Sequence, residues 1–370
     1  MKNRTIKYNL EKREHRVTFC YDTEAPDISN DMARLFSDKK MLLVIDKSIN
    51  KKVIKNIFKD LEHSDFDVKF LMVDGHKSNK TEKLLFKIID KCIENKFTKK
   101  SLILSCSGGV VGDVCALASS LYLRGLIYFH IPTTMTAIVD SCIGGKTGIN
   151  NNFGKNLVGS FYQPDLVISD IKLLNSLPYR EIICGYAEIL KSSLIDSYKN
   201  FKFLNKNLNK ILKLKSPFIE KAIIDSCKLK KKIVEKDEKE KNLRKVLNLG
   251  HTFAHAYEST LKFTKKLNHG EAVIIGIKNA IKFSNKNKVL SNQKFQLINE
   301  HINKIGLTHE FSKLFKKKDL NKILNFIKSN KKNNSSKINL ILIKDFGKIK
   351  TNFQINSLKL KPFLLKELNK

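Results

Sequence analysis

The feature that most constrains the fold is a short apolar segment, residues 102–106, that leads directly into Ser107-Gly-Gly-Val-Val-Gly-Asp113. Residues 114–118 are apolar on every face of a helix, which predicts that this helix is buried. A strand, a glycine turn and a helix start present backbone N–H donors at the positive end of the helix dipole. The segment therefore suits a pyrophosphate, although the spacing is not Gly-x-Gly-x-x-Gly and a tight packing turn is the alternative.

The chain before residue 74 alternates between apolar strands and helical stretches. The pattern predicts strands at residues 16–20, 41–45 and 68–73 and a helix at residues 53–61. Repeated strand, helix and strand indicate parallel pairing, and such sheets bind ligands beyond the carboxyl ends of their strands. Asp46, Lys47 and Ser48 follow one strand directly, so they either hold an adenosine or form an ordinary turn with a helix N-cap.

Glycines and lysines recur after the next predicted strand, residues 126–131, which ends at Pro132-Thr133-Thr134. Asp140 precedes Gly144-Gly-Lys146-Thr-Gly148, and Lys155-Asn156 follow another glycine. A lysine beside a glycine can reach a phosphate that the backbone also approaches. Chance explains any one such lysine in this chain, but two within a short segment indicate an anion site.

The pattern changes to helices at about residue 179, and no strand is predicted again before residues 338–343, which begin a hairpin turning at residues 345–347. A domain boundary is expected near residues 177–178. The predicted fold class is an α/β amino-terminal domain (1–178) with a parallel-rich, Rossmann-like sheet. An all-helical carboxyl-terminal domain (179–370) completes it.

The helical half carries two candidate chemical features. Glu188 and Lys191 lie three residues apart on one helix face among apolar neighbours, where a carboxylate needs an ion-pair partner or a metal. His251 and His255 share a helix face, as metal ligands on helices do, and His269 follows. The zinc-protease motif is absent, because no Glu follows His251. A simple Glu–Lys pair and two core histidines explain these residues as well as a metal site does.

Size and composition set the broad class. The chain has 370 residues, of which 42% are hydrophobic, enough for two domain cores. It has no apolar run long enough to span a membrane and no signal-peptide core at its start, so we expect a soluble, cytoplasmic protein without membrane partners. The seven cysteines are isolated, which is typical of core positions in a reducing compartment.

The formal charge of +34 suggests nucleic-acid binding, because basic surfaces attract polyphosphates. The lysines, however, are scattered along the whole chain, and there is no Trp and no aromatic-plus-glycine stacking motif. We therefore expect a solvated basic surface and no specific nucleic-acid partner.

Several segments, in one order, resemble the 3-dehydroquinate synthase family over residues 40–350. The most specific are Gly-Gly-Val-Val-Gly-Asp, Pro-Thr-Thr, Val-Asp-Ser-x-x-Gly-Gly-Lys-Thr-Gly, Gly-Lys-Asn, Phe-Tyr-Gln-Pro, Tyr-Ala-Glu-Ile-Leu-Lys, Leu-Asn-Leu-Gly-His-Thr-Phe-x-His and His-Gly-Glu-Ala-Val. The resemblance implies a dehydroquinate synthase-like fold, NAD in the first domain, a catalytic Zn²⁺ for which Co²⁺ can substitute, and a homodimer.

The resemblance also implies a role for particular residues. The metal ligands would be Glu188, His251 and His269, which leaves His255 for the substrate. The cofactor-binding residues would be Asp46, Lys80, Gly108, Gly109, Asp113, Thr133, Thr134, Lys146 and Lys155. The catalytic residues would be Lys146, Asn156, Lys191 and His255, and the other substrate contacts Arg124, Asp140, Lys230, Arg244, Asn248 and Lys331. Arg124 is expected at the substrate phosphate, in its own site or a partner subunit's site.

The implied reaction converts 3-deoxy-D-arabino-heptulosonate 7-phosphate, a small-molecule sugar phosphate, to 3-dehydroquinate and phosphate. It combines transient oxidation by NAD, phosphate elimination, re-reduction and an intramolecular aldol closure, and belongs to the shikimate pathway of aromatic amino acid biosynthesis. Arg244, Asn248 and His255 favour this substrate over that of another sugar-phosphate cyclase. A metal-dependent polyol dehydrogenase of the same superfamily is the other enzyme alternative, and a basic nucleic-acid-binding protein is the third.

Three positions depart from the family pattern. Ser107 stands where the family usually has Gly. His76 stands in the segment before the second cofactor lysine, for which Lys80 is the candidate. Asn330 precedes Lys331 where an Asp is expected, which weakens the assignment of Lys331 to the substrate phosphate.

Overall fold

A computed structural model of the chain describes residues 4–10, 13–20, 38–62, 66–262, 264, 266–307, 310–328 and 337–369. The chain divides into two compact units. The first contains Met1–Ile182 and Lys230–Lys239, and the second contains Ile183–Leu229 and Glu240–Lys370. Each unit is described below by itself.

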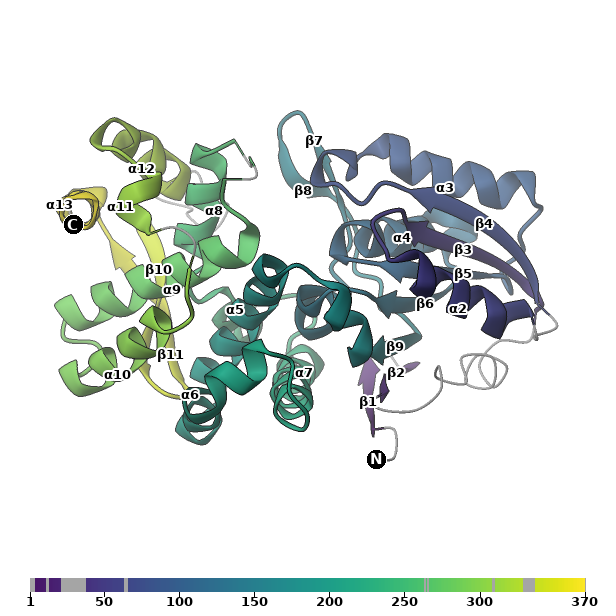
Figure 1. The fold of residues 1–370 in the computed structure, drawn as a ribbon. Helices are drawn as coiled ribbons and strands as arrows, with labels where there is room; N and C mark the ends of the chain where they lie inside the picture. Colours follow the sequence, from purple (N-terminus) through teal and green to yellow (C-terminus); the bar gives the residue numbers. More distant parts are fainter. Residues whose placement is uncertain are drawn as a thin grey trace. The chain divides into compact units, whose positions relative to one another are not determined.

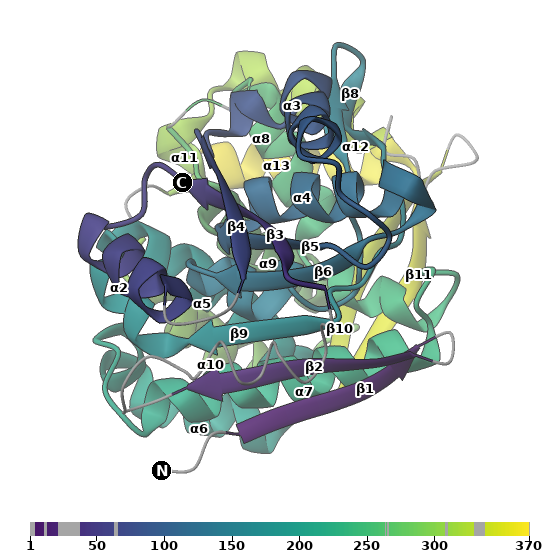
Figure 2. The same ribbon diagram turned by 90° about the vertical axis from the view of Figure 1, so that its right-hand side faces the viewer.

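The first unit is built on a seven-stranded sheet with the strand order β1-β2-β9-β6-β5-β3-β4. Its strands are β1 (Arg4–Leu10), β2 (Arg13–Cys20), β3 (Lys40–Asp46), β4 (Asp67–Val73), β5 (Leu102–Ser107), β6 (Ile127–Pro132) and β9 (Leu166–Asp170). Only the β1–β2 pair is antiparallel, and every other pair in this sheet is parallel. Figure 2 shows these strands fanning from β1 to β4. The parallel-rich sheet expected from the sequence is confirmed.

Helices cover both faces of this sheet (Figure 1). They are α2 (Lys51–Glu62), α3 (Glu82–Glu94) and α4 (Gly109–Leu121). Leu42 and Val44 of β3 point into the core beneath α3 and α4, whereas Met41, Leu43 and Ile45 point into the core beneath α2. Because both faces are buried, β3 and β5 read as continuous apolar runs without alternation.

Shorter elements complete the first unit. They are the π-helix Ala137–Ser141, the hairpin strands β7 (Ile149–Asn151) and β8 (Gly154–Val158), and the 3₁₀ turns Lys77–Asn79, Tyr122–Arg124 and Ile171–Ser176. Helix α4 begins two residues after β5 ends, so its amino terminus lies at the sheet edge expected to bind ligands.

The second unit is helical apart from one antiparallel hairpin. Its helices are α5 (Tyr179–Asp196), α6 (Tyr198–Leu212), α7 (Phe218–Lys236), α8 (His251–Thr260), α9 (His269–Lys286), α10 (Asn292–Asn303), α11 (Phe311–Leu314), α12 (Leu320–Lys328) and α13 (Ser357–Leu368), with 3₁₀ turns at Leu243–Asn248 and Lys317–Asp319. The hairpin consists of β10 (Ile338–Asp345) and β11 (Lys348–Ile355). The first residues of α5 and the last residues of α7 belong to the first unit. The β10–β11 hairpin lies beside α9 (Figure 1) and turns where the sequence predicts. Among the described residues, no helix is both long enough and apolar enough to cross a membrane.

The sequence analysis missed β1, β9 and the β7–β8 hairpin. In β1 the side chains of Ile6, Tyr8 and Leu10 alternate and are buried, which is the period-two signal of a sheet with one covered face. Strand β9 has only a short apolar run, Leu166-Val-Ile168, and its position in the sheet is determined by its pairing with both β2 and β6. The β7–β8 strands are short and polar, so their sequence carries no strand pattern.

Candidate metal centre and active site

One carboxylate and two imidazoles converge in the second unit. The side chains belong to Glu188 on α5, His251 at the first position of α8 and His269 at the first position of α9. One donor atom from each lies within 4.8 Å of the other two. The Nε2 atoms of His251 and His269 lie 3.6 Å and 4.0 Å from Oε1 of Glu188.

Glycines let the three helices approach closely enough for this convergence. A Cβ atom at Gly270 would lie 2.2 Å from the Cα of Cys184, one helical turn before Glu188 on α5. A Cβ atom at Gly276 of α9 would lie 2.2 Å from the carbonyl oxygen of Gly250, the N-cap residue of α8. Because neither position has room for a side chain, glycine lets the start of α9 lie against α5 and the start of α8 lie against α9.

Hydrogen bonds orient both imidazole rings. The Nδ1 atom of His251 lies 3.4 Å from the carbonyl oxygen of Leu249. The Nδ1 atom of His269 lies 3.0 Å from Oε2 of Glu258, a buried carboxylate on α8. With Nδ1 bonded in this way, each ring presents Nε2 toward Glu188. Sequence reasoning missed Glu258, although its position seven residues after His251 places it on the same helix face.

The donor set fits a divalent metal ion. Glu188 is 1% exposed, and its Oε1 atom has no hydrogen bond to any described residue. Lys191, also buried, forms an ion pair with the other oxygen of this carboxylate. Two imidazole nitrogens and a carboxylate oxygen are a donor set that zinc enzymes use while leaving a coordination position open. An ion would also supply the partner that Oε1 lacks.

His255 is placed differently from the other two histidines. Its side chain is exposed, and its ring centroid lies 5.4 Å from that of His251 and 6.1 Å from that of His269. It does not belong to the group of converging donor atoms among the described residues. The substrate role that the family resemblance implies for His255 stays a prediction.

A lysine, an aspartate and an asparagine from distant segments meet in the first unit. The Nζ atom of Lys80 lies 2.5 Å from Oδ2 of Asp113 and 2.7 Å from Oδ1 of Asn156. Lys80 precedes α3, Asp113 lies on the first turns of α4, and Asn156 lies on β8 with a left-handed φ of 49°. Burial raises the pKa of Asp113 above its ordinary value of 3.8, and the Lys80 ammonium opposes that rise. Three of the predicted ligand-binding residues are thus brought together.

The amino terminus of α4 is formed by the predicted glycines. A Cβ atom at Gly108 would lie 3.2 Å from Cγ2 of Thr134, and one at Gly109 would lie 3.0 Å from Oγ of Ser141. Thr134 also accepts a hydrogen bond from the backbone N–H of Ala137 at 3.2 Å. The Oγ atoms of Ser107 and Ser141 are buried without a hydrogen-bond partner among the described residues. These unpaired hydroxyls beside a helix N-terminus suit an anionic ligand. The remaining predicted residue of this segment, Thr133, is buried and donates its N–H to the carbonyl of Ser107 at 3.0 Å.

Asp46 has a structural role in its turn. Its Oδ1 atom accepts hydrogen bonds from the backbone N–H groups of Ser48, at 2.9 Å, and Gly75, at 3.3 Å. The carboxylate therefore joins the end of β3 to the segment after β4. This is the ordinary turn that the sequence left open as an alternative.

The other predicted residues lie in both units. Asp140 and the buried Lys230 form an ion pair within the first unit. Arg124 and Lys146 are exposed and Lys155 is half-buried, all in the first unit. In the second unit Arg244 is buried, and the Nδ2 atom of Asn248 donates to Oε1 of Glu240 at 2.5 Å. Lys331 and Asn330 lie outside the described residues.

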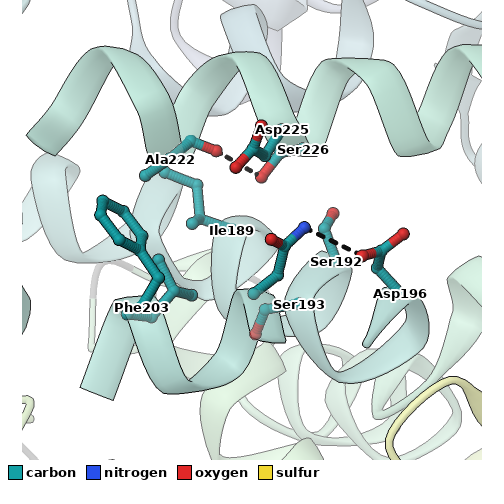
Figure 3. Close-up of a pocket in the computed structure, with 10 residues that line it drawn as sticks. Ile189, Ser192, Ser193, Asp196, Phe203, Ala222, Asp225 and Ser226 are labelled. Carbon is teal, nitrogen blue, oxygen red and sulfur yellow. Dashed lines mark hydrogen bonds between the residues drawn. The ribbon is translucent and has the colours of Figure 1, made fainter. Parts of the chain in front are cut away.

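A separate small hollow lies between α5, α6 and α7 of the second unit (Figure 3). Two of its polar side chains bond within it: Nδ2 of Asn200 donates to Oδ2 of Asp196 at 2.9 Å, and Oγ of Ser226 donates to the Ala222 carbonyl at 2.9 Å. The side chains in Figure 3 do not include a residue of the metal centre. We assign this hollow to helix packing.

Comparison with known proteins identifies the family. The chain matches the 3-dehydroquinate synthase N-terminal domain over residues 70–184 and the C-terminal domain over residues 185–333. A 3-dehydroquinate synthase of Pelagibacter ubique (strain HTCC1062) is 50% identical over 329 residues, which cover 89% of each chain. The chain belongs to the 3-dehydroquinate synthase family. A second 3-dehydroquinate synthase, from Thermoanaerobacter sp. (strain X514), is 35% identical and covers 93% of this chain and 95% of its own.

Solved structures share the fold of this 3-dehydroquinate synthase family member. A 2-deoxy-scyllo-inosose synthase complexed with carbaglucose-6-phosphate, NAD⁺ and Co²⁺ has a TM-score of 0.86 at 22% identity, over 98% of this chain and 100% of its own. A 2-epi-5-epi-valiolone synthase from Streptomyces hygroscopicus subsp. jinggangensis 5008, with NAD⁺ and Zn²⁺ bound, has a TM-score of 0.86 at 21% identity, over 98% of each chain. The predicted family and fold are confirmed.

Proposed function

We propose that the protein converts 3-deoxy-D-arabino-heptulosonate 7-phosphate to 3-dehydroquinate and phosphate. The observation that carries this proposal is the convergence of Glu188, His251 and His269 in a chain half identical to a 3-dehydroquinate synthase over nearly its whole length. The proposal keeps two functional regions, residues 1–178 for NAD and residues 179–370 for the metal and the substrate.

The proposed cofactors are NAD and Zn²⁺, with Co²⁺ as a functional substitute. Structures of the same fold that contain NAD⁺ with Co²⁺ or Zn²⁺ support this choice. When bound, NAD would supply a reversible hydride acceptor, and the metal ion would polarise the hydroxyl that is oxidised. Glu188, His251 and His269 would hold the ion, and Gly108 and Gly109 leave room for a pyrophosphate at the start of α4.

Charged residues of the chain would hold and orient the anionic substrate. Lys191 is buried beside Glu188, so its ammonium can stay close to the metal centre and bind a substrate oxygen. His255 is exposed one turn from His251 and can take or give a proton at a substrate hydroxyl. The aldol closure joins two parts of one molecule, so the residues around it need only hold the reacting atoms in place.

In the first unit, Lys80 connects two predicted ligand-binding segments. Its ammonium bonds both the Asp113 carboxylate on α4 and the Asn156 amide on β8. We propose that Asp113 contacts the cofactor and that Asn156 contacts the substrate. Lys80, which bonds to both side chains, would hold these two segments in fixed positions relative to each other. Lys146 precedes β7 and Lys155 lies on β8, and both supply positive charge for the bound phosphates.

We also propose that the protein works as a cytoplasmic homodimer in which Arg124 contacts the substrate phosphate. Support for a function of Arg124 comes from its backbone: Leu123, Arg124 and Gly125 have φ values of 49°, 64° and 136°. Left-handed backbone at two residues that are not glycine is unfavourable and is often retained for a functional reason. Light scattering of the purified protein would measure the oligomeric state.

The proposal is tested by supplying the heptulosonate phosphate to protein loaded with NAD and zinc. We expect phosphate and dehydroquinate in equal amounts and no net NADH. Absence of phosphate release from the loaded protein would overturn the proposal. Net NADH formation from a simple alcohol would favour a polyol dehydrogenase, and phosphate release only from another sugar phosphate would favour a different cyclase.

A further inference from the structure

Glu258 is a buried carboxylate that belongs to none of the sequence motifs. It lies on α8, seven residues after His251, and is 2% exposed. The same helix face carries His251, His255 and Glu258 at successive turns. The Oε2 atom of Glu258 lies 3.0 Å from Nδ1 of His269, at the start of α9. A carboxylate buried to this extent needs a specific partner, and the imidazole is one.

We propose that Glu258 is a positioning residue that orients His269 for the metal ion, an inference that rests on the proposed zinc site. The carboxylate accepts a hydrogen bond from Nδ1–H, which selects the tautomer whose Nε2 lone pair is free. That Nε2 atom is the one that lies 4.0 Å from Oε1 of Glu188. The negative charge also makes the imidazole a better metal ligand than a neutral acceptor would.

His269 depends on such a partner more than His251 does. The His251 side chain is 11% exposed and its Nδ1 atom faces a backbone carbonyl, whereas the His269 side chain is 31% exposed. With less packing around the ring, the hydrogen bond to Glu258 contributes a larger share of its orientation.

The alternative is that the Glu258–His269 contact only joins α8 to α9. Other contacts already join these helices: Gly276 packs against the carbonyl oxygen of Gly250. The start of α9 has its own capping box, in which Glu271 accepts the N–H of Asn268 at 2.8 Å. Glu258 is therefore not needed to place α9, and its removal should affect the metal more than the fold.

The test compares zinc affinity in the parent protein, Glu258→Gln, Glu258→Ala and Glu367→Gln, by competition with a chelator. Glu367 is the matched control because it is a buried carboxylate of the same unit, ion-paired with Lys282. We expect Glu258→Ala to bind zinc about 10–100-fold more weakly and Glu258→Gln, which keeps an acceptor oxygen, about 3–10-fold more weakly. Glu367→Gln should bind zinc as the parent does. The absorption spectrum of the Co²⁺-loaded protein should change in both Glu258 variants and not in the control.

Thermal unfolding of the metal-free proteins separates positioning from folding. If folded Glu258→Gln binds zinc as tightly as the parent, the proposal is overturned, whether or not Glu258→Ala folds. A lower melting temperature in the Glu258 variants with unchanged zinc affinity also overturns it, because the contact would then be structural. If the parent itself binds no zinc, it is the proposed function that fails.

Discussion

The ammonium of Lys80 lies 2.5 Å from the carboxylate of Asp113, an ion pair between side chains that are only 10% and 22% exposed. The pair connects the segment before α3 to the first turns of α4, where the predicted cofactor site begins. Burial raises the pKa of Asp113, and the Lys80 ammonium, more than the Lys230 ammonium, lowers it, so the charge of the carboxylate depends mainly on the contact with Lys80.

Replacing Lys80 with Met should destabilise the protein by about 2 kcal/mol at pH 7, because a partly buried carboxylate loses its main donor. The loss should shrink toward pH 4. The folded pKa of Asp113 lies above its unfolded value, so the folded state binds more protons than the unfolded state. The stability of the protein therefore falls as the pH rises from the unfolded pKa through the folded pKa. Urea unfolding at both pH values measures the effect. Lys77→Met, at an exposed lysine nearby, is the control, and equal losses in both variants would contradict the role given to Lys80.

Ser107→Ala should stabilise the metal- and cofactor-free protein by about 1 kcal/mol, because it removes a buried hydroxyl that has no partner among the described residues. The same change should weaken NAD binding roughly tenfold, since this hydroxyl adjoins the α4 terminus. Ser169→Ala, on β9, is the control: it removes another buried hydroxyl without a partner among the described residues, so it should stabilise the protein without changing NAD binding. Calorimetry of unfolding and of NAD binding checks both effects. Tighter NAD binding by Ser107→Ala would show that the departure from Gly hinders the cofactor.

Two buried histidines should make the fold sensitive to acid. Burial lowers the pKa of His130 and of His301 from 6.5 to about 4. At pH values between about 4 and 6.5, the unfolded chain binds more protons than the folded one, so the folded state loses stability as the pH falls. The loss from pH 7 to pH 5 should be about 2 kcal/mol smaller in His130→Gln than in the parent. Urea unfolding at the two pH values measures it. An unchanged pH dependence would mean that the pKa of His130 is the same in the folded and unfolded states.

Gly270→Ala should weaken zinc binding at least tenfold although Gly270 offers no ligand atom. A Cβ atom there would lie 2.2 Å from the Cα of Cys184, so α9 must move away from α5 and carry His269 from Glu188. The matched control is Gly306→Ala, whose Cβ would meet nothing within 4 Å. Its left-handed φ of 76° costs about 1 kcal/mol of stability, with no expected change in zinc affinity. Chelator competition measures both variants, and equal zinc affinity in Gly270→Ala and the parent would contradict the helix-approach argument.

Much of the fold followed from local patterns. Apolar strands and the glycine turn at Ser107–Gly109 predicted the parallel sheet and the start of α4, and the confirmed hairpin at β10–β11 came from the same kind of signal. Strand β9 was missed because its place depends on pairing with β2 and β6, which no local pattern contains. Strand β1 was missed even though its alternation of Ile6, Tyr8 and Leu10 was visible.

The site was less accessible to sequence reasoning. Helical spacing paired His251 with His255, and apolar neighbours marked Glu188 as a carboxylate that needs an ion pair or a metal. Only the family resemblance combined Glu188 with His251 and His269 as one ligand set. The meeting of Lys80 with Asn156, which lie 76 residues apart, required the folded chain. Glu258 was missed because one glutamate in a helix carries no motif, and its role depends on the approach of α9.

The measurement that tests the account most directly is the zinc content of the purified protein and four variants. Glu188→Gln, His251→Ala and His269→Ala should each lose the stoichiometric zinc of the parent, whereas His255→Ala should keep the metal and lose catalytic rate. Loss of zinc from His255→Ala together with its retention in His269→Ala would contradict the ligand set on which the proposed function depends.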